Sequence, residues 1–158
     1  MRVSEICSRS VSYVRRDTAV LEAARRMRED HVGDLIVVDD RRREGEASNE
    51  VVPVGVLTDR DVVVGVLAQD ADHVRTLDVG DVIAPEGALV SATEDEDLRP
   101  VLQRMRSFGV RRLPVVDDRG VLTGVLSVDD VIAALVDELA EVAALVTRQA
   151  TRESERRP

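Results

Sequence analysis

The sequence predicts a mixed α/β (α+β) protein built from two copies of one β-α-β-β-α unit, because long stretches of it recur. Residues 32–40 (VGDLIVVDD) match residues 110–118 (VRRLPVVDD) at an offset of 78. Residues 55–62 match residues 124–131 at an offset of 69, through a shared Gly-Val-Leu run followed by Thr or Ser. Two copies of the same order of patterns indicate two copies of the same fold.

The first copy begins with an extended segment and an amphipathic helix. Val20, Ala23, Ala24 and Met27 have the i, i+3, i+4, i+7 spacing of one buried helix face. Two runs rich in β-branched residues follow, and then a second, shorter helix. The expected elements are a strand at 11–14, a helix near 18–30, strands at 35–38 and 54–57, and a helix at 61–69.

The second copy repeats this order. Leu98, Val101, Leu102 and Met105 reproduce the helical spacing. Because an interior proline disrupts a helix, we place the helix start near residue 97, so that Pro100 lies in the first turn. The expected elements are a strand at 88–91, a helix to about residue 107, and strands at 113–116 and 121–126, joined by the turn Asp118-Arg119-Gly120.

The matches predict repeat 1 at residues 1–78 and repeat 2 at residues 79–137. The offset falls from 78 to 69, so repeat 1 holds nine additional residues, which fall within 41–52. This segment is rich in charge and contains Gly, Ser and Asn, which is typical of a solvated loop insertion. A loop that binds a partner is the alternative interpretation.

The last helix extends beyond its counterpart, over residues 138–150. Val131, Leu135, Leu139, Val142 and Val146 fall on one face of it. This apolar stripe packs either on its own domain or on a second subunit, and the sequence leaves both options open. Residues 151–158 are charged and poor in apolar residues, so we expect a disordered tail.

Composition excludes several classes of function. The net charge of −9 argues against nucleic acid as a partner. All basic residues are Arg, which removes Schiff-base lysine chemistry. Cys7, His31 and His73 are isolated and form no metal-ligand or catalytic spacing. With no signal peptide and no membrane-spanning run, we expect a cytoplasmic, non-catalytic protein without a metal or an obligatory cofactor.

The duplicated motifs resemble the tandem CBS-domain family. The resemblance rests on GVLTDRD at 55–61, GVLSVDD at 124–130, GVRRLPVVD at 109–117 and DVIAP at 81–85. It implies two repeats packed about a pseudo-twofold axis with two clefts between them. In this family such pairs often form homodimers. Many members bind adenosine-containing ligands in the clefts and regulate an attached or partner protein.

The repeated Gly-x-x-Thr/Ser-x-x-Asp pattern carries the candidate chemistry. Gly55 and Gly124 permit close backbone approach late in a strand. Thr58 and Ser127 then lie where a helix begins, a place that favours phosphate. A carboxylate one turn later can accept hydrogen bonds from both hydroxyls of a ribose, and the candidates are Asp61 and Asp130. The same pattern also resembles a capping box, which only starts a helix.

The two clefts are expected to differ in charge. Repeat 2 has Arg111 and Arg112 where repeat 1 has Gly33 and Asp34. Arginine offers a fork of donors to phosphate, whereas aspartate repels it, so one cleft should prefer phosphorylated ligands. A solvated strand edge is the alternative for the two arginines. The expected apolar slot for adenine includes Val32, Val110 and Pro114.

The sequence therefore predicts a regulatory module that binds AMP, ADP, ATP, NAD or S-adenosylmethionine and signals to an unknown protein effector in trans. The ligand would bias the packing of the repeats or of a homodimer. A ligand-free, stress-associated scaffold with the same fold is the alternative. Thermal shift with the five candidate ligands discriminates between the two.

Overall fold

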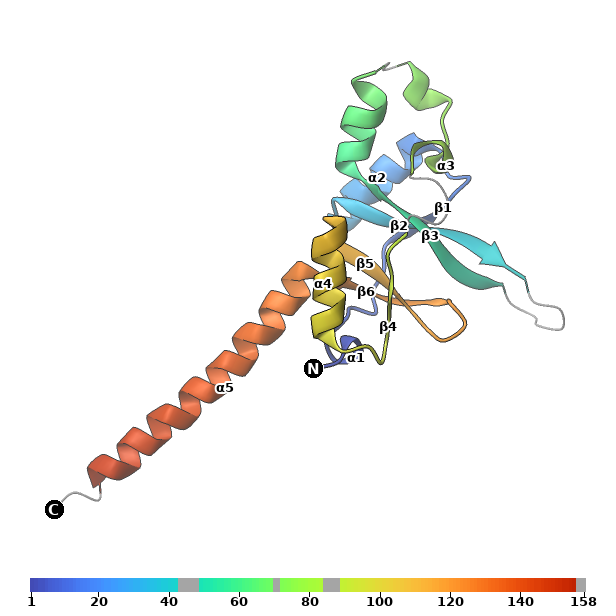
Figure 1. Ribbon diagram of the computed structural model, residues 1–158. Helices are drawn as coiled ribbons and strands as arrows, with labels where there is room; N and C mark the ends of the chain where they lie inside the picture. Colours follow the sequence, from blue (N-terminus) through green and yellow to red (C-terminus); the bar gives the residue numbers. More distant parts are fainter. Residues whose placement is uncertain (43–48, 70–71, 84–88, 156–158) are drawn as a thin grey trace.

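Two three-stranded sheets form the framework of the protein. The computed structural model describes residues 1–42, 49–69, 72–83 and 89–155. In each sheet the first strand pairs parallel with the middle strand, and the last strand pairs antiparallel with it (Figure 1). The first sheet contains β1 (Tyr13–Arg15), β2 (Asp34–Arg41) and β3 (Glu50–Thr58), and the second contains β4 (Ala92–Thr93), β5 (Arg112–Val116) and β6 (Leu122–Ser127).

The sheets confirm the predicted duplication. The register shifts between Val37 and Val38 in β2, and between Val115 and Val116 in β5, which are equivalent positions at the offset of 78. The central residues of both middle strands are almost fully buried. Two aliphatic clusters form the core, one for each sheet. A mixed α/β pair of repeats is therefore the observed fold class.

One amphipathic helix packs on each sheet. These helices are α2 (Val20–Asp30) and α4 (Leu98–Phe108). Pro100 is the third residue of α4, where its missing N–H costs no helical hydrogen bond. The residues that follow the two helices, His31 and Gly109, both have a left-handed backbone, with φ of 55° and 66°. Gly109 adopts this conformation freely, and His31 adopts it at a cost.

Two short helices are exchanged between the repeats. Helix α1 (Val3–Ile6) belongs to repeat 1 in sequence, but Val3 is fully buried in the core of the second sheet. Helix α3 (Val79–Val82) follows repeat 1, and Val79 is fully buried in the core of the first sheet. The start of each sequence repeat therefore completes the core of the other one.

Several predicted boundaries shift. Strand β1 begins two residues later than expected, and β4 lies at 92–93 rather than 88–91, of which residue 88 lies outside the described residues. The expected loop at 41–52 is shorter, because Arg41 pairs with Glu50 at the end of the β2–β3 ladder. Residues 43–48 lie outside the described residues. After β3 come the π-helix η1 (Asp61–Leu67) and the short η2 (His73–Arg75).

The C-terminal helix leaves the body of the protein. Helix α5 (Val128–Glu155) packs at its start through Val131, which is buried, and then projects away as a single rod (Figure 1). The helix continues through residues 151–155, where we expected a disordered tail; residues 156–158 lie outside the described residues. Leu139 and Val146 are more than 60% exposed, so the stripe does not pack on its own domain in this structure.

Candidate functional site

Both copies of the predicted motif fold into the same small network of hydrogen bonds. At the end of β3, the backbone N–H and the hydroxyl of Thr58 donate to Oδ2 of Asp61 at 2.9 and 2.7 Å. At the end of β6, the same groups of Ser127 donate to Oδ2 of Asp130 at 2.9 and 2.6 Å. Each Asp N–H donates back to the hydroxyl at 3.1 Å. This is the reciprocal geometry of a capping box.

The network uses one oxygen of each carboxylate. Only Oδ2 of Asp61 and of Asp130 accepts these bonds, and no described residue donates a hydrogen bond to Oδ1. An ionised carboxylate has acceptor sites on both oxygens. The capping role is therefore real, and it leaves one oxygen of each aspartate available to a ligand.

The first cleft, here called the Asp130 cleft, lies between the repeats. Its walls combine the segment before β1, the beginning of β2, and the junction of β6 with α5. Gly124 is required beside it, because an added Cβ would lie 2.9 Å from the carbonyl oxygen of Ser8. The cleft has a volume of about 200 Å³ and is lined by Ser8, Ser10, Val11, Ser12, Val32, Asp34, Ile36, Arg112, Val125, Ser127 and Asp130.

The second cleft, here called the Phe108 cleft, lies at the equivalent place on the other side of the repeat interface. It is the more apolar of the two, with a volume of about 180 Å³. An added Cβ at Gly55 would lie 2.7 Å from Ile83, so this glycine permits close packing as its counterpart does. The lining residues are Val54, Gly55, Val56, Leu89, Val90, Phe108, Val110 and Arg112.

The structure brings together most, but not all, of the predicted site residues. Ser127 and Asp130 line the first cleft with Val32, whereas Val110 and Gly55 line the second. The pair Thr58 and Asp61 lines neither cleft, although it follows the strand that lines the Phe108 cleft. Residues 84–88, which are equivalent to residues 6–10 beside the Asp130 cleft, lie outside the described residues.

Two further candidate residues, Arg111 and Pro114, lie outside both linings. Arg111 is exposed and lines neither cleft, in keeping with its alternative interpretation as a solvated strand edge. Pro114 is buried within β5 and also lines neither cleft. Sequence reasoning missed the serines at positions 8, 10 and 12. They precede β1 of the first sheet, whereas the motif they contact follows β6 of the second sheet. The backbone of Ser8 pairs with Val125 in both directions at 2.9 Å, and this pairing places them there.

Arg112 forms an ion pair with Asp34. These residues occupy equivalent positions at the offset of 78. We expected Arg112 to favour phosphate and Asp34 to repel it, and the sequence left open which aspartate pairs with which arginine. In the structure the two side chains contact each other across the repeat interface. Their side chains are 29% and 23% exposed, so the pair is accessible from solvent. The carboxylate of Asp34 therefore neutralises the guanidinium of Arg112.

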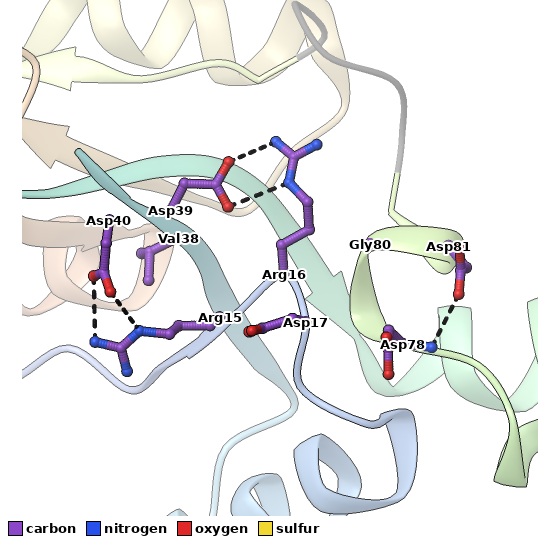
Figure 2. Close-up of a pocket in the computed structure, with 9 residues that line it drawn as sticks. All are labelled: Arg15, Arg16, Asp17, Val38, Asp39, Asp40, Asp78, Gly80 and Asp81. Atoms are coloured by element: carbon purple, nitrogen blue, oxygen red, sulfur yellow. Dashed lines mark hydrogen bonds and ion pairs between the residues drawn. The ribbon is translucent and has the colours of Figure 1, made fainter. Parts of the chain in front are cut away.

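A hollow larger than either cleft lies away from both of them. It has a volume of about 560 Å³ and lies beside the end of β1 and helix α3 (Figure 2). Arg15 donates to Asp40 at 3.0 and 3.2 Å, and Arg16 contacts Asp39 at 3.0 and 3.3 Å. The remaining lining residues include Asp17, Asp78, Gly80 and Asp81. Because its cations already pair with its own carboxylates, this hollow is a network of ion pairs rather than a preformed site.

The described residues offer little for covalent or metal chemistry. Burial raises the pKa of the Cys7 thiol, which disfavours the nucleophilic thiolate. Within the described ranges, no three His, Cys, Asp or Glu side chains gather closely enough to hold a metal ion. In the same ranges, no helix has the length and apolar character that crossing a bilayer requires.

Comparison with known proteins assigns the duplicated unit. A model of the CBS domain matches the chain twice, over residues 3–67 and 79–137. The chain belongs to the CBS-domain family. It is a tandem CBS pair, and the two matches correspond to the two predicted repeats.

Similar proteins include both uncharacterised and ligand-bound CBS pairs. The "Uncharacterized 17.7 kDa protein in bps2 3'region" of Acidianus ambivalens is 31% identical over 140 residues, covering 86% of this chain and 74% of that protein. The crystal structure of Arabidopsis thaliana CBSX2 in complex with AMP is 26% identical, with a TM-score of 0.68, covering 86% of this chain and 96% of that chain.

A second structure supports the fold alone. The CBS pair of protein MJ0100, in complex with methylthioadenosine and S-adenosylmethionine, is 22% identical with a TM-score of 0.69, covering 87% of this chain and 98% of that chain. Across three curated relatives, the present chain spans 74%, 60% and 55% of their length.

Proposed function

We propose that this CBS pair is a non-catalytic sensor that binds an adenosine-containing ligand between its repeats and signals to a partner protein in trans. One observation carries the proposal. Asp130 lines a cleft formed by both repeats, and one of its carboxylate oxygens is left unused by the capping network. The AMP bound to CBSX2 supports the same ligand class for this chain.

The Asp130 cleft offers a group for each part of such a ligand. The carboxylate of Asp130 suits the ribose hydroxyls, which are donors. Val32 and Ile36 offer apolar surface for adenine. Arg112 is the cation available to a phosphate, and it can bind a phosphate oxygen in the bidentate manner that guanidinium favours. Candidate ligands are AMP, ADP, ATP, NAD and S-adenosylmethionine.

The position of the cleft gives the ligand a route to regulation. Val32 and Asp34 belong to repeat 1, and Ser127 and Asp130 belong to repeat 2. A ligand that contacts both walls stabilises the arrangement of repeats in which both contacts are made. A partner protein that recognises this arrangement would then respond to ligand concentration.

Thermal unfolding with each of the five candidate ligands tests the proposal. A ligand at 100 times its Kd stabilises the native state by about 2.7 kcal/mol. For a protein of this size, the Tm should rise by about 5 to 10 °C. Since the chain has no Trp, unfolding is best followed by far-UV circular dichroism. A Tm unchanged by every candidate would contradict the proposal and favour a ligand-free scaffold, whose aspartates only cap helices.

We further infer that α5 pairs with a second copy of this chain. Ile132, Leu135, Leu139, Val142 and Val146 follow the alternating spacing of three and four residues found in coiled coils. Together with Val136 and Leu145 they form a continuous apolar stripe whose side chains are 49% to 68% exposed, a surface typical of an interaction site.

Sedimentation velocity tests the α5 pairing. Leu139→Glu places a charge at the centre of the stripe and should convert dimer to monomer. Ala144→Glu adds the same charge on the opposite side of α5 and should leave the dimer intact. A wild-type protein that is monomeric at micromolar concentration, or a Leu139→Glu variant that remains dimeric, would contradict the pairing.

A further inference from the structure

Arg112 lines both clefts at once. Among the described residues, it is the one residue common to the lining of the Asp130 cleft and that of the Phe108 cleft, and the one basic side chain in either lining. In the described part of the chain, the two clefts therefore share one guanidinium for phosphate.

The repeat symmetry explains why one side chain reaches both sites. Asp34 and Arg112 are equivalent residues of the two repeats, and they form an ion pair. Two equivalent positions can contact each other only beside the pseudo-twofold axis that relates the repeats. The two clefts are also related by this axis, so a side chain beside it lies between them. If both equivalent positions were arginine, each cleft would have its own cation. In this chain one of the two positions is Asp34, so Arg112 is the single cation at the axis.

We propose that Arg112 is shared between the clefts, so that a phosphorylated ligand in one cleft weakens the binding of a second phosphorylated ligand in the other. The inference rests on the proposed adenosine-ligand function and deepens it. A guanidinium presents one planar fork, which can serve one phosphate in bidentate geometry. The second phosphate would find the fork occupied and would bind without that charge-assisted contact. The loss of this contact weakens the second binding step roughly tenfold.

A neutral ligand should not show this coupling. Adenosine has the same base and ribose as AMP but no phosphate, so it makes no demand on Arg112. The clefts should therefore bind two adenosine molecules independently. The protein would thus respond to the charge of its ligands as well as to their total concentration, because the second cleft would fill with AMP only at higher concentration.

Isothermal titration with AMP and with adenosine measures the coupling. Val32→Trp fills the Asp130 cleft and Val110→Trp fills the Phe108 cleft, at equivalent positions, so each variant reports the intrinsic affinity of the other cleft. Circular dichroism confirms that each variant folds. Asp130→Ala at the Asp130 cleft, or Val90→Trp at the Phe108 cleft, replaces a variant that does not. For adenosine, the wild-type titration should equal the sum of the two single-cleft titrations. For AMP, the second wild-type site should be roughly tenfold weaker than that sum requires.

Removal of the shared charge should abolish the coupling. In the double variant Arg112→Gln, Asp34→Asn, which leaves no unpaired carboxylate, AMP should bind to both clefts as weakly and as independently as adenosine. Arg111→Gln is the matched control, since it removes the neighbouring exposed charge that lines neither cleft. It should retain the wild-type coupling.

Two outcomes would overturn the shared arginine and leave the proposed function standing: independent binding of AMP to wild-type protein, or equal coupling for AMP and adenosine. Coupling that persists in the double variant would overturn it as well. The absence of binding by either ligand to any variant would instead overturn the proposed function itself.

Discussion

Glu50 joins the two repeats through arginines from both of them, and the loss of one partner should be measurable. Its side chain is only 7% exposed. Arg41 of β2 donates to it at 2.7 and 3.0 Å, and Arg119 of the repeat-2 turn lies 3.0 Å from its other oxygen. Arg41 also donates to the backbone carbonyl of Arg119 at 2.7 Å. The hairpin lengthened in repeat 1 is therefore tied to the turn of repeat 2.

The expected cost of Arg119→Ala follows from the burial of Glu50. The variant removes one of two cations that compensate a buried carboxylate, and the uncompensated charge costs about 2 kcal/mol. In a chain of this length the Tm should fall by about 4 to 8 °C. Both arginines are more than 40% exposed, so the direct ion-pair energy is small, and the cost comes mainly from the carboxylate left behind.

Urea unfolding, followed by circular dichroism at 222 nm, gives the free energy of each variant. Arg42→Ala, which removes an exposed arginine of the same hairpin, is the control and should change stability by less than about 0.5 kcal/mol. In a cycle with Glu50→Gln, the two substitutions should couple by at least about 0.5 kcal/mol. If Arg119→Ala costs no more than Arg42→Ala, or if the cycle is additive, Glu50 does not hold the repeats together.

Two further predictions concern stability. Burial alone would raise the pKa of Glu96, but hydrogen bonds from Arg104 and from the backbone N–H of Thr93 outweigh it and lower the pKa below its usual range. The stabilisation is therefore complete above the unfolded pKa of about 4.3 and is lost as pH falls through the lower folded pKa. The difference in Tm between wild type and Glu96→Gln should be constant above about pH 5.5 and shrink toward pH 3. A difference in Tm that stays constant down to pH 3 would refute the assignment. His31→Gly should raise stability by about 0.5 to 1 kcal/mol, because glycine adopts a φ of 55° without strain. Gly109→Ala should lower stability by about 1 kcal/mol for the converse reason. Thermal unfolding measures both changes, and a change in the direction opposite to the expected one would contradict the reasoning.

The sequence predicted the elements whose patterns are long enough to read. Helices α2 and α4 and the two middle strands follow from apolar spacing, and Pro100 fixed the start of α4. The exchange of α1 and α3 could not be predicted, since each helix is four residues long and has one buried valine. Strand β4 was placed too early because the apolar residues that precede it resemble a strand, whereas parallel pairing with β5 selects the next two residues.

The candidate site could be predicted only where a local sequence pattern marks it. The motif ending at Asp130 was visible in the sequence, because duplication marked it. Its contacts with the segment at Ser8–Ser12 depend on how the chain start packs on the opposite repeat, which no local pattern records. The contact of Asp34 with Arg112 depends on the position of the symmetry axis. The stripe on α5 was visible too, but periodicity alone does not identify the surface that covers it.

Calorimetric titration of AMP into wild type, Asp130→Ala and Asp129→Ala tests the central claim most directly. Asp129 is exposed on the same turn of α5 and does not line the cleft, so its removal controls for the loss of one charge. We predict that Asp130→Ala weakens AMP binding at this cleft by about 10- to 100-fold, the worth of a hydrogen bond to a charged group, and that Asp129→Ala binds as wild type does. Equal affinity in all three proteins would mean that Asp130 only caps its helix, and the proposed ligand site would be wrong.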